Sequence, residues 1–308
     1  FRGIAVSWLV GWAYMRMFRN LAFVMLLTSL FPARADAEIN RAESIEWTTA
    51  DADLVIRGSV ASINATPLPP GWFDVTFNVS ETIKGKASKQ VTVRLRHVGG
   101  EQPDEWQAKK RDLLLFAVKA SKRADDKNYN KATWALRSGL GDAAVLVLDE
   151  KQVTRAFARD FSVLETRDAI LAAVRKAAPS QATKAQQLDA PAESPAFKAL
   201  WAGSAVWLYV PVDAALETQA IAWLKSNDLR LREEAVAALA NFHTVANVAR
   251  MTTLLRDPAV VTVQSHDKPA VLRYVLRAQA DKILTDWGVA HATPIIEQPR
   301  QDRKSTRL

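Results

Sequence analysis

The sequence has 308 residues, 24% of them charged and none of them cysteine, with a formal net charge of +8 at pH 7. The absence of cysteine excludes disulfides, thiol catalysis, cysteine-ligated zinc, iron–sulfur clusters and c-type haem attachment. Six of the eight net positive charges lie in two end segments, residues 1–35 and 302–308. The remainder is nearly balanced, so charge gives no case for nucleic acid or an anionic membrane as a partner.

Residues 15–37 have the three parts of a cleavable signal peptide. Arg16 and Arg19 form a basic start, residues 21–31 are an apolar run, and small residues at 35–37 suit signal peptidase. A helix of that apolar length crosses only about half of a bilayer's hydrocarbon core, which disfavours a permanent anchor. We therefore expect an exported protein, periplasmic or extracellular, with no integral membrane anchor after signal cleavage.

The two ends of the sequence differ from its middle. Residues 1–14 precede the first methionine, Met15, and we expect them to be upstream read-through. Residues 291–308 are predicted to be a tail. Its last part, residues 302–308, resembles the conceptual translation of a sequencing adapter, and we expect it not to be native to the chain.

Residues 38–160 are predicted to form a small β domain. Residues 53–64 are expected to be a strand with a bulge or bend at Gly58, and residues 73–82 place apolar side chains on one face. Residues 112–119 are apolar on both faces, which predicts a central strand. Five to seven such strands separated by turns favour a small barrel or sandwich.

Three motifs in this region resemble the netrin-like, OB-type barrels. They are residues 52–60 (ADLVIRGSV), residues 82–85 (TIKG) and residues 110–116 (KRDLLLF). The resemblance implies a small β-barrel of that type. This chain lacks the disulfides of the extracellular family and the N-terminal cysteine with which its metalloprotease inhibitors bind zinc, so that inhibitory activity is not implied.

A helix followed by a linker is predicted over residues 161–195. Thr166 is a suitable N-cap for a helix over 166–177, and Arg175 and Lys176 suit its C-terminal turn. The stretch 179–195 is rich in Ala, Gln, Ser and Pro, which is typical of a linker.

Residues 196–290 are predicted to form a helical domain. Apolar side chains recur at helical spacing in 214–226, 228–239, 245–255 and 271–287, with Asp228 as an N-cap. The insertion 259–269 departs from this pattern and is expected to be a strand or an exposed loop.

These helices resemble HEAT-type α-solenoid repeats. Arg232 and Arg277 occupy equivalent motif positions 45 residues apart, within the range of this repeat class. The motif positions are Asp228, Leu231, Arg232, Ala235, Ala238 and Leu239, and again Leu276, Arg277, Ala280 and Leu284. The predicted fold class is therefore multidomain α+β, a small OB/netrin-like barrel followed by a short HEAT-like helical domain.

The sequence offers few candidate site residues. None of the four histidines has the spacing of a metal ligand, and no nucleophile elbow or phosphate-binding loop occurs. We therefore expect no catalytic residue, metal or cofactor. Trp72 beside a Pro-Gly loop, and His266 and Asp267 in the insertion, are the candidate binding residues. The pair Glu233-Glu234 is predicted to lie on a solvated helix face.

These features favour a non-catalytic binding or scaffold protein of a bacterial envelope, whose partner is another envelope protein. One alternative is a hydrolase of envelope polymers with dispersed carboxylates, which requires two convergent Asp or Glu in a pocket. Another is a carbohydrate-binding module that uses exposed tryptophan. The sequence leaves the oligomeric state open.

Overall fold

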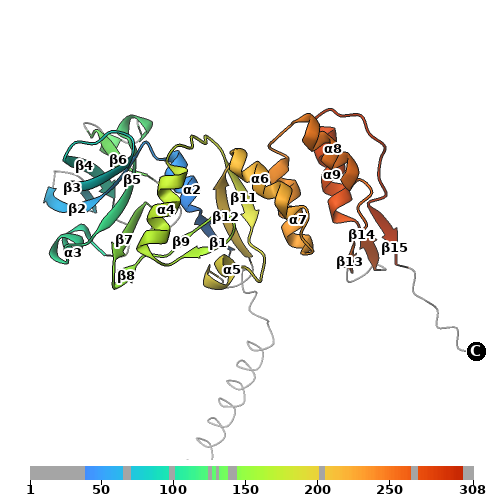
Figure 1. Cartoon of the computed structure of the whole chain (residues 1–308), viewed down its shortest axis with the longest axis horizontal. Helices are drawn as coiled ribbons and strands as arrows, with labels where there is room; N and C mark the ends of the chain where they lie inside the picture. Colours follow the sequence, from blue (N-terminus) through green and yellow to red (C-terminus); the bar gives the residue numbers. More distant parts are fainter. Residues whose placement is uncertain are drawn as a thin grey trace, which may run out of the picture. The chain divides into compact units, whose positions relative to one another are not determined.

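A computed structural model describes residues 39–64, 71–96, 101–123, 127–129, 132–137, 144–200, 205–264 and 270–300. Within them the fold is α+β and contains a closed five-stranded β-barrel (Figure 1). The predicted signal peptide and upstream segment, residues 1–37, and the segment 302–308 lie outside the described residues. The described residues from Asn40 onward fall in one compact unit.

The barrel closes because its first strand pairs on both edges. In sequence order its strands are β2 (Leu54–Asn64), β3 (Trp72–Lys84), β4 (Gln90–Arg96), β5 (Leu113–Lys119) and β6 (Trp134–Leu136). Strand β2 pairs antiparallel with both β3 and β5, while β4 pairs parallel with β6. The order around the barrel is therefore β2-β3-β4-β6-β5 and back to β2.

Alternating apolar side chains fill the barrel, as the pattern in 73–82 predicts. Val75 and Phe77 of β3 are fully buried. Gly58 lies at a register shift between β2 and β3, which confirms the predicted bulge. A Cβ at Gly58 would lie 2.1 Å from the carbonyl oxygen of Asn78, closer than atoms can pack. The bulge therefore requires glycine because the partner strand passes so near.

Strand β5 is buried on both faces, as its sequence predicts. One face lies in the barrel, and the other packs with helices α2 (Ile45–Asp51) and α4 (Arg167–Ala177) in a second core cluster. Thr166 caps α4, its hydroxyl accepting a hydrogen bond from the Ala169 amide at 3.3 Å. Strands β7 (Val145–Asp149) and β8 (Gln152–Val153) extend the sheet from β5.

Part of the predicted linker is a strand. Residues Ala185–Asp189 form β11, which pairs with β12 (Ala205–Pro211), and β1 (Ile39–Glu43) pairs on the other side of β12. Leu188 is fully buried in the core beneath this sheet. The composition of 185–189 is polar for a strand, but tertiary burial of one side chain and pairing along β12 outweigh it. Short strands β9 (Ala156–Phe157) and β10 (Val163–Leu164) form a separate pair.

The C-terminal half contains the four predicted helices, but the fourth begins at Val275, and residues 271–273, predicted as its start, form a strand instead. The four helices are α6 (Ala214–Trp223), α7 (Leu229–Leu239), α8 (Val245–Leu254) and α9 (Val275–Asp286), and a short helix, α5 (Pro195–Leu200), precedes β12. Asp228 caps α7 as predicted, and Gly288 follows α9 with φ +69°. The predicted apolar stripes are buried in one core with the sheet β1-β12-β11; fully buried members include Leu216, Ala220, Ala235, Ala238, Leu239, Met251, Leu276, Ala280 and Leu284.

The insertion between α8 and α9 contains a strand, one of its two predicted forms. Strands β13 (Val261–Val263) and β14 (Val271–Arg273) pair antiparallel, and β15 (Glu297–Pro299) pairs with the other edge of β14. None of the helices that the structure describes is long and apolar enough to cross a membrane.

Candidate functional site

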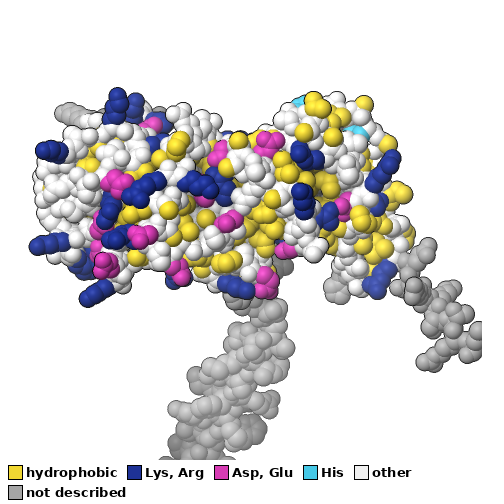
Figure 2. All heavy atoms as spheres, in the orientation of Figure 1, with side chains coloured by type: hydrophobic (Ala, Val, Ile, Leu, Met, Phe, Trp, Pro, Cys, Tyr) yellow, Lys and Arg dark blue, Asp and Glu magenta, His cyan; other side chains and the backbone are white. Residues whose placement is uncertain are grey.

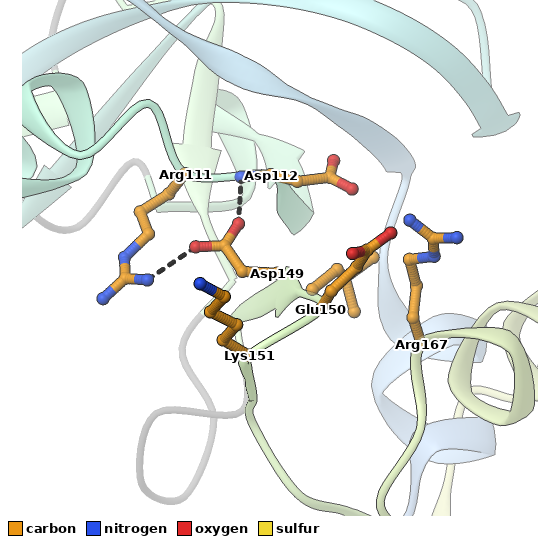
Figure 3. A pocket seen from close by; sticks show the side chains of 7 residues that line it. Arg111, Asp112, Asp149, Glu150, Lys151 and Arg167 are labelled. Carbon is orange, nitrogen blue, oxygen red and sulfur yellow. Dashed lines mark hydrogen bonds and ion pairs between the residues drawn. The ribbon is translucent and has the colours of Figure 1, made fainter.

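A surface depression of about 380 Å³ lies beside the barrel (Figure 3). It is formed where the chain enters β5, where β7 turns into β8, and where α4 begins. Its lining residues are Arg111, Asp112, Leu148, Asp149, Glu150, Lys151 and Arg167. The depression thus brings together three acidic and three basic side chains over one buried leucine.

Two of its three carboxylates are already held by cations and backbone amides. Asp112 is paired with the Arg57 guanidinium at 2.7 Å, and its own amide donates to Asp149 at 2.8 Å. Arg111 donates to the other oxygen of Asp149. Charge-assisted hydrogen bonds of this kind fix both carboxylates in structural pairs.

Arg111 also binds Glu101 at the edge of the depression. Hydrogen bonds from Arg111, and next from Lys109, lower the pKa of Glu101 to about 2. The Arg111 guanidinium is therefore divided between two carboxylates, Glu101 and Asp149. It holds the entry to β5 against the β7–β8 turn, which is a structural role.

The remaining side chains of the depression are less constrained. Glu150 and Lys151 are exposed in the β7–β8 turn, and Arg167 at the start of α4 contacts Asp168 at 3.5 Å (Figure 3). These groups can contact a small charged or zwitterionic ligand by ion pairing. Exposed ion pairs of this kind contribute little binding energy each.

Trp72 is buried rather than exposed. It is the first residue of β3, is 9% exposed, and meets the ring of Tyr129 edge-on with centroids 5.0 Å apart. Tyr129 comes from the short 3-10 turn η2 (Lys127–Tyr129), which covers this end of the strand. The expectation that Trp72 offers a free ring was therefore wrong, because the loop after β5 folds over it. His266 and Asp267 lie outside the described residues.

The outward face of β3 and β4 carries a row of paired polar side chains. Asp74 and Arg94 form a two-point ion pair with both distances 2.7 Å. Farther along the strands, Thr76 bonds Thr92 at 2.8 Å and Asn78 bonds Gln90 at 2.9 Å. Thr92, Asn78 and Gln90 are exposed. This face offers hydrogen-bonding groups in a regular row, and cross-strand pairing fixes their positions.

Two arginines of the helical half bind the same residue. Arg232 of α7 forms an ion pair with the Asp257 carboxylate, and Arg277 of α9 donates to the Asp257 carbonyl at 2.6 Å. Asp257 lies in the turn after α8. A single turn residue thus joins two helices whose motif positions the sequence had aligned.

Two exposed residues and one half-buried residue lie together near the ends of these helices. His243, in the turn between α7 and α8, stacks on Trp287 with ring centroids 4.9 Å apart and planes 10° apart. Val245, two residues farther on, is 89% exposed, which is unusual for a large apolar side chain. Figure 2 shows histidine atoms next to apolar atoms over the α8 and α9 region. We call His243, Val245 and Trp287 the helix-end cluster. No sequence pattern placed these three residues near one another.

Glu233 and Glu234 are buried, contrary to the prediction of a solvated face. They are 9% and 8% exposed. Helix α7 packs between α6 and α9 and also against β11, so that little of its surface is free. The helical periodicity of one segment does not reveal such multiple contacts.

Known proteins give no guide to this arrangement. Comparisons with protein-family models, curated proteins and solved structures found no match to the chain. No group of three or more His, Asp or Glu among the described residues is arranged to hold a metal ion.

Proposed function

We propose that this chain is a non-catalytic binding protein, exported to a bacterial envelope, that contacts another envelope protein. In this proposal an OB-type barrel and a HEAT-like helical stack each supply a contact surface. The helix-end cluster carries the proposal, because tryptophan is enriched in protein-binding hot spots and Val245 is a large apolar side chain left exposed to solvent.

The strand order supports the OB-type assignment. Numbered within the barrel, the strands run 1-2-3-5-4 and close on strand 1, with strands 3 and 5 parallel. A helix, α3 (Pro103–Ala108), lies between the third and fourth strands, and its Trp106 packs into the barrel core. This is the connectivity of a five-stranded Greek-key barrel of the OB type.

The helix pairing supports the HEAT-like assignment. Helices α6 and α7 pack together, as do α8 and α9, and α7 also packs on α9. Asn247 of α8 donates to Glu217 of α6 at 2.7 Å, so the two pairs also meet through their other helices. Stacked antiparallel pairs that contact only their neighbours are the building plan of α-solenoids.

Site chemistry favours binding over the two alternatives. The carboxylates Asp112 and Asp149 of the depression are engaged in structural pairs, which weakens the case for a hydrolase. Trp72 lies beneath Tyr129, which weakens the case for a sugar-stacking platform at that residue. Export, through the signal peptide predicted at 15–37, remains part of the proposal.

Site-directed photocrosslinking tests the contact directly. A photoreactive amino acid replaces Val245 in the full chain, and the same residue replaces exposed Lys151 as a control. In envelope extract we expect position 245 to give one discrete adduct, and the added substitution Trp287→Ala to abolish it. Equal adducts from both positions, or none from position 245, would contradict the proposal.

Cell fractionation tests export separately. A chain expressed from Met15 should be recovered outside the cytoplasm with its N-terminus at residue 36 or 38. Recovery of an unprocessed chain in the cytoplasm would contradict the proposed signal peptide without bearing on the helix-end cluster.

A further inference from the structure

Glu234 joins the helical stack to the sheet β1-β12-β11 through a buried carboxylate. It lies in the middle of α7, and its Oε2 accepts a hydrogen bond at 2.9 Å from the amide of Asp189, the last residue of β11. The residue is 8% exposed. A buried carboxylate is therefore one polar link between this strand end and α7.

The charges around Glu234 do not balance it. Asp189 and Glu233 are both acidic, and the cation that they share with it is Arg230. The Arg230 guanidinium lies 3.1 Å from Glu233 and 3.5 Å from Asp189, and its side chain is 62% exposed. One solvated arginine thus faces three carboxylates, and its hydrogen bonds go to the other two.

The charged groups on the other helices packed against α7 are engaged elsewhere. On α6, Glu217 accepts from Asn247. On α9, Arg277 donates to the Asp257 carbonyl, and Asp257 also pairs with Arg232 of α7. None of these described groups supplies Glu234 with a cation.

Glu46 is a covered carboxylate that has a less exposed cation beside it. Glu46 of α2 is also half of a buried contact, but it accepts from the Arg159 amide at 3.1 Å and lies 3.8 Å from the Arg159 guanidinium. Arg159 is half-buried, with a side chain 12% exposed, and it also pairs with Asp213 at 2.6 Å. Glu46 therefore shares a largely covered cation with one other carboxylate, whereas the arginine near Glu234 is 62% exposed and its hydrogen bonds go to two other carboxylates.

We propose that the contact between β11 and α7 is a proton-operated latch, closed when Glu234 carries a proton and loosened when Glu234 is ionised. Ionisation would place a third carboxylate charge, beside those of Asp189 and Glu233, in a site with one exposed cation, which low-dielectric surroundings disfavour. Burial, and next the negative charge of Asp189, raise the pKa of Glu234 to about 7 against the lowering effect of its hydrogen bond. The latch would therefore operate near neutral pH.

The position of α7 determines which parts of the fold would separate when the latch loosens. Its buried side chains Ala235, Val236 and Leu239 share one core with Leu188 of β11 and Leu208 of β12. Loosening this contact would free the first helix pair from the sheet while leaving the barrel core, a separate cluster, intact. This inference does not depend on the proposed function.

Hydrogen exchange of the full chain tests the latch. Protection of residues 185–189 and 229–239 is measured by mass spectrometry from pH 5.5 to 8.5 and corrected for intrinsic exchange rates. We expect protection in the wild-type chain to fall about tenfold around pH 7, and in E234Q to stay constant. The control E150Q removes an exposed carboxylate of the barrel side and should behave as wild type.

A flat wild-type profile, or a pH profile in E234Q equal to that of wild type, would overturn the proposal. If E234Q does not fold, infrared titration of the wild-type chain and of E46Q decides instead. A protonated carboxyl that titrates near pH 7 and persists in E46Q supports the latch, and its absence from both chains overturns it.

Discussion

Arg137 and Glu43 form a buried ion pair across 94 positions of sequence, with Nη1 2.6 Å from Oε2. Their side chains are 2% and 8% exposed. Arg137 follows the last strand of the barrel, and Glu43 ends the edge strand of the sheet β1-β12-β11. Arg137 also binds Asp51 at 2.7 Å and lies over the Trp47 ring, so one guanidinium joins the barrel to β1 and α2.

Arg137→Met should be strongly destabilising. Removing the cation leaves the Glu43 carboxylate buried without a partner, which typically costs about 3–5 kcal/mol. Urea unfolding followed by circular dichroism measures the loss. Arg175→Met is the matched control, because its pair with Glu81 is half exposed and should contribute much less. Equal losses of unfolding free energy in the two variants would show that the buried pair does not stabilise the contact of the barrel with β1 and α2.

Gly58→Ala should destabilise the barrel more than Gly288→Ala destabilises the end of α9. A Cβ at position 58 meets the Asn78 carbonyl oxygen at 2.1 Å, whereas a Cβ at 288 meets nothing within 4 Å. Gly288 has φ +69°, so alanine there costs only about 1 kcal/mol of backbone strain. Thermal melting compares the two variants. A Gly58→Ala chain as stable as wild type would contradict the steric account of the bulge.

Arg232 and Arg277 should be energetically coupled, because both act on Asp257. Arg232→Met, Arg277→Met and the double variant form a mutant cycle measured by urea unfolding. Loss of one arginine leaves the turn less fixed for the other, so we expect a coupling energy of about 0.5–3 kcal/mol. If the losses of unfolding free energy in the two single variants simply add in the double variant, the turn does not couple α7 to α9. That outcome would weaken the HEAT-like proposal.

Glu101 should make the barrel sensitive to acid. Its pKa is lowered to about 2 by Arg111 and Lys109, so its contribution to stability is fully present above about pH 4.5 and is lost as pH falls toward 2. Because Lys109 is half exposed, we expect no more than about 1 kcal/mol. Melting temperatures from pH 7 to 2 should fall less steeply in E101Q than in wild type. Parallel curves would show that Glu101 is not the responsible group.

Local patterns predicted much of the fold correctly. Alternation identified the inward face of β3, the double-sided apolar run identified β5, and Thr166 and Asp228 marked where two helices begin. Each of these depends on contacts within a short segment or on one repeating face, so a single stretch of sequence contains the signal.

The candidate site residues were less predictable. Trp72 was expected to be free and Glu234 solvated, yet both are covered by segments distant in sequence. Residues 185–189 were expected to be linker because of their polar composition. They form a strand because they pair with β12, which lies beyond residue 204 and so outside any local pattern. The burial of these side chains and the pairing of this strand depend on contacts between segments distant in sequence, which no local pattern predicts.

Lys84 and Gly85 illustrate what the local sequence predicts and what only tertiary contacts determine. A glycine after an apolar strand pattern is by itself a turn signal, and Gly85 adopts φ +82°, a conformation that favours glycine. Only the tertiary structure decided what Lys84 does: its ammonium donates to the carbonyls of Thr49 and Ala50 at 2.8 and 2.7 Å, at the C-terminal end of α2. Those carbonyls lack helical partners, and a cation can satisfy them only after the barrel has brought it beside the helix.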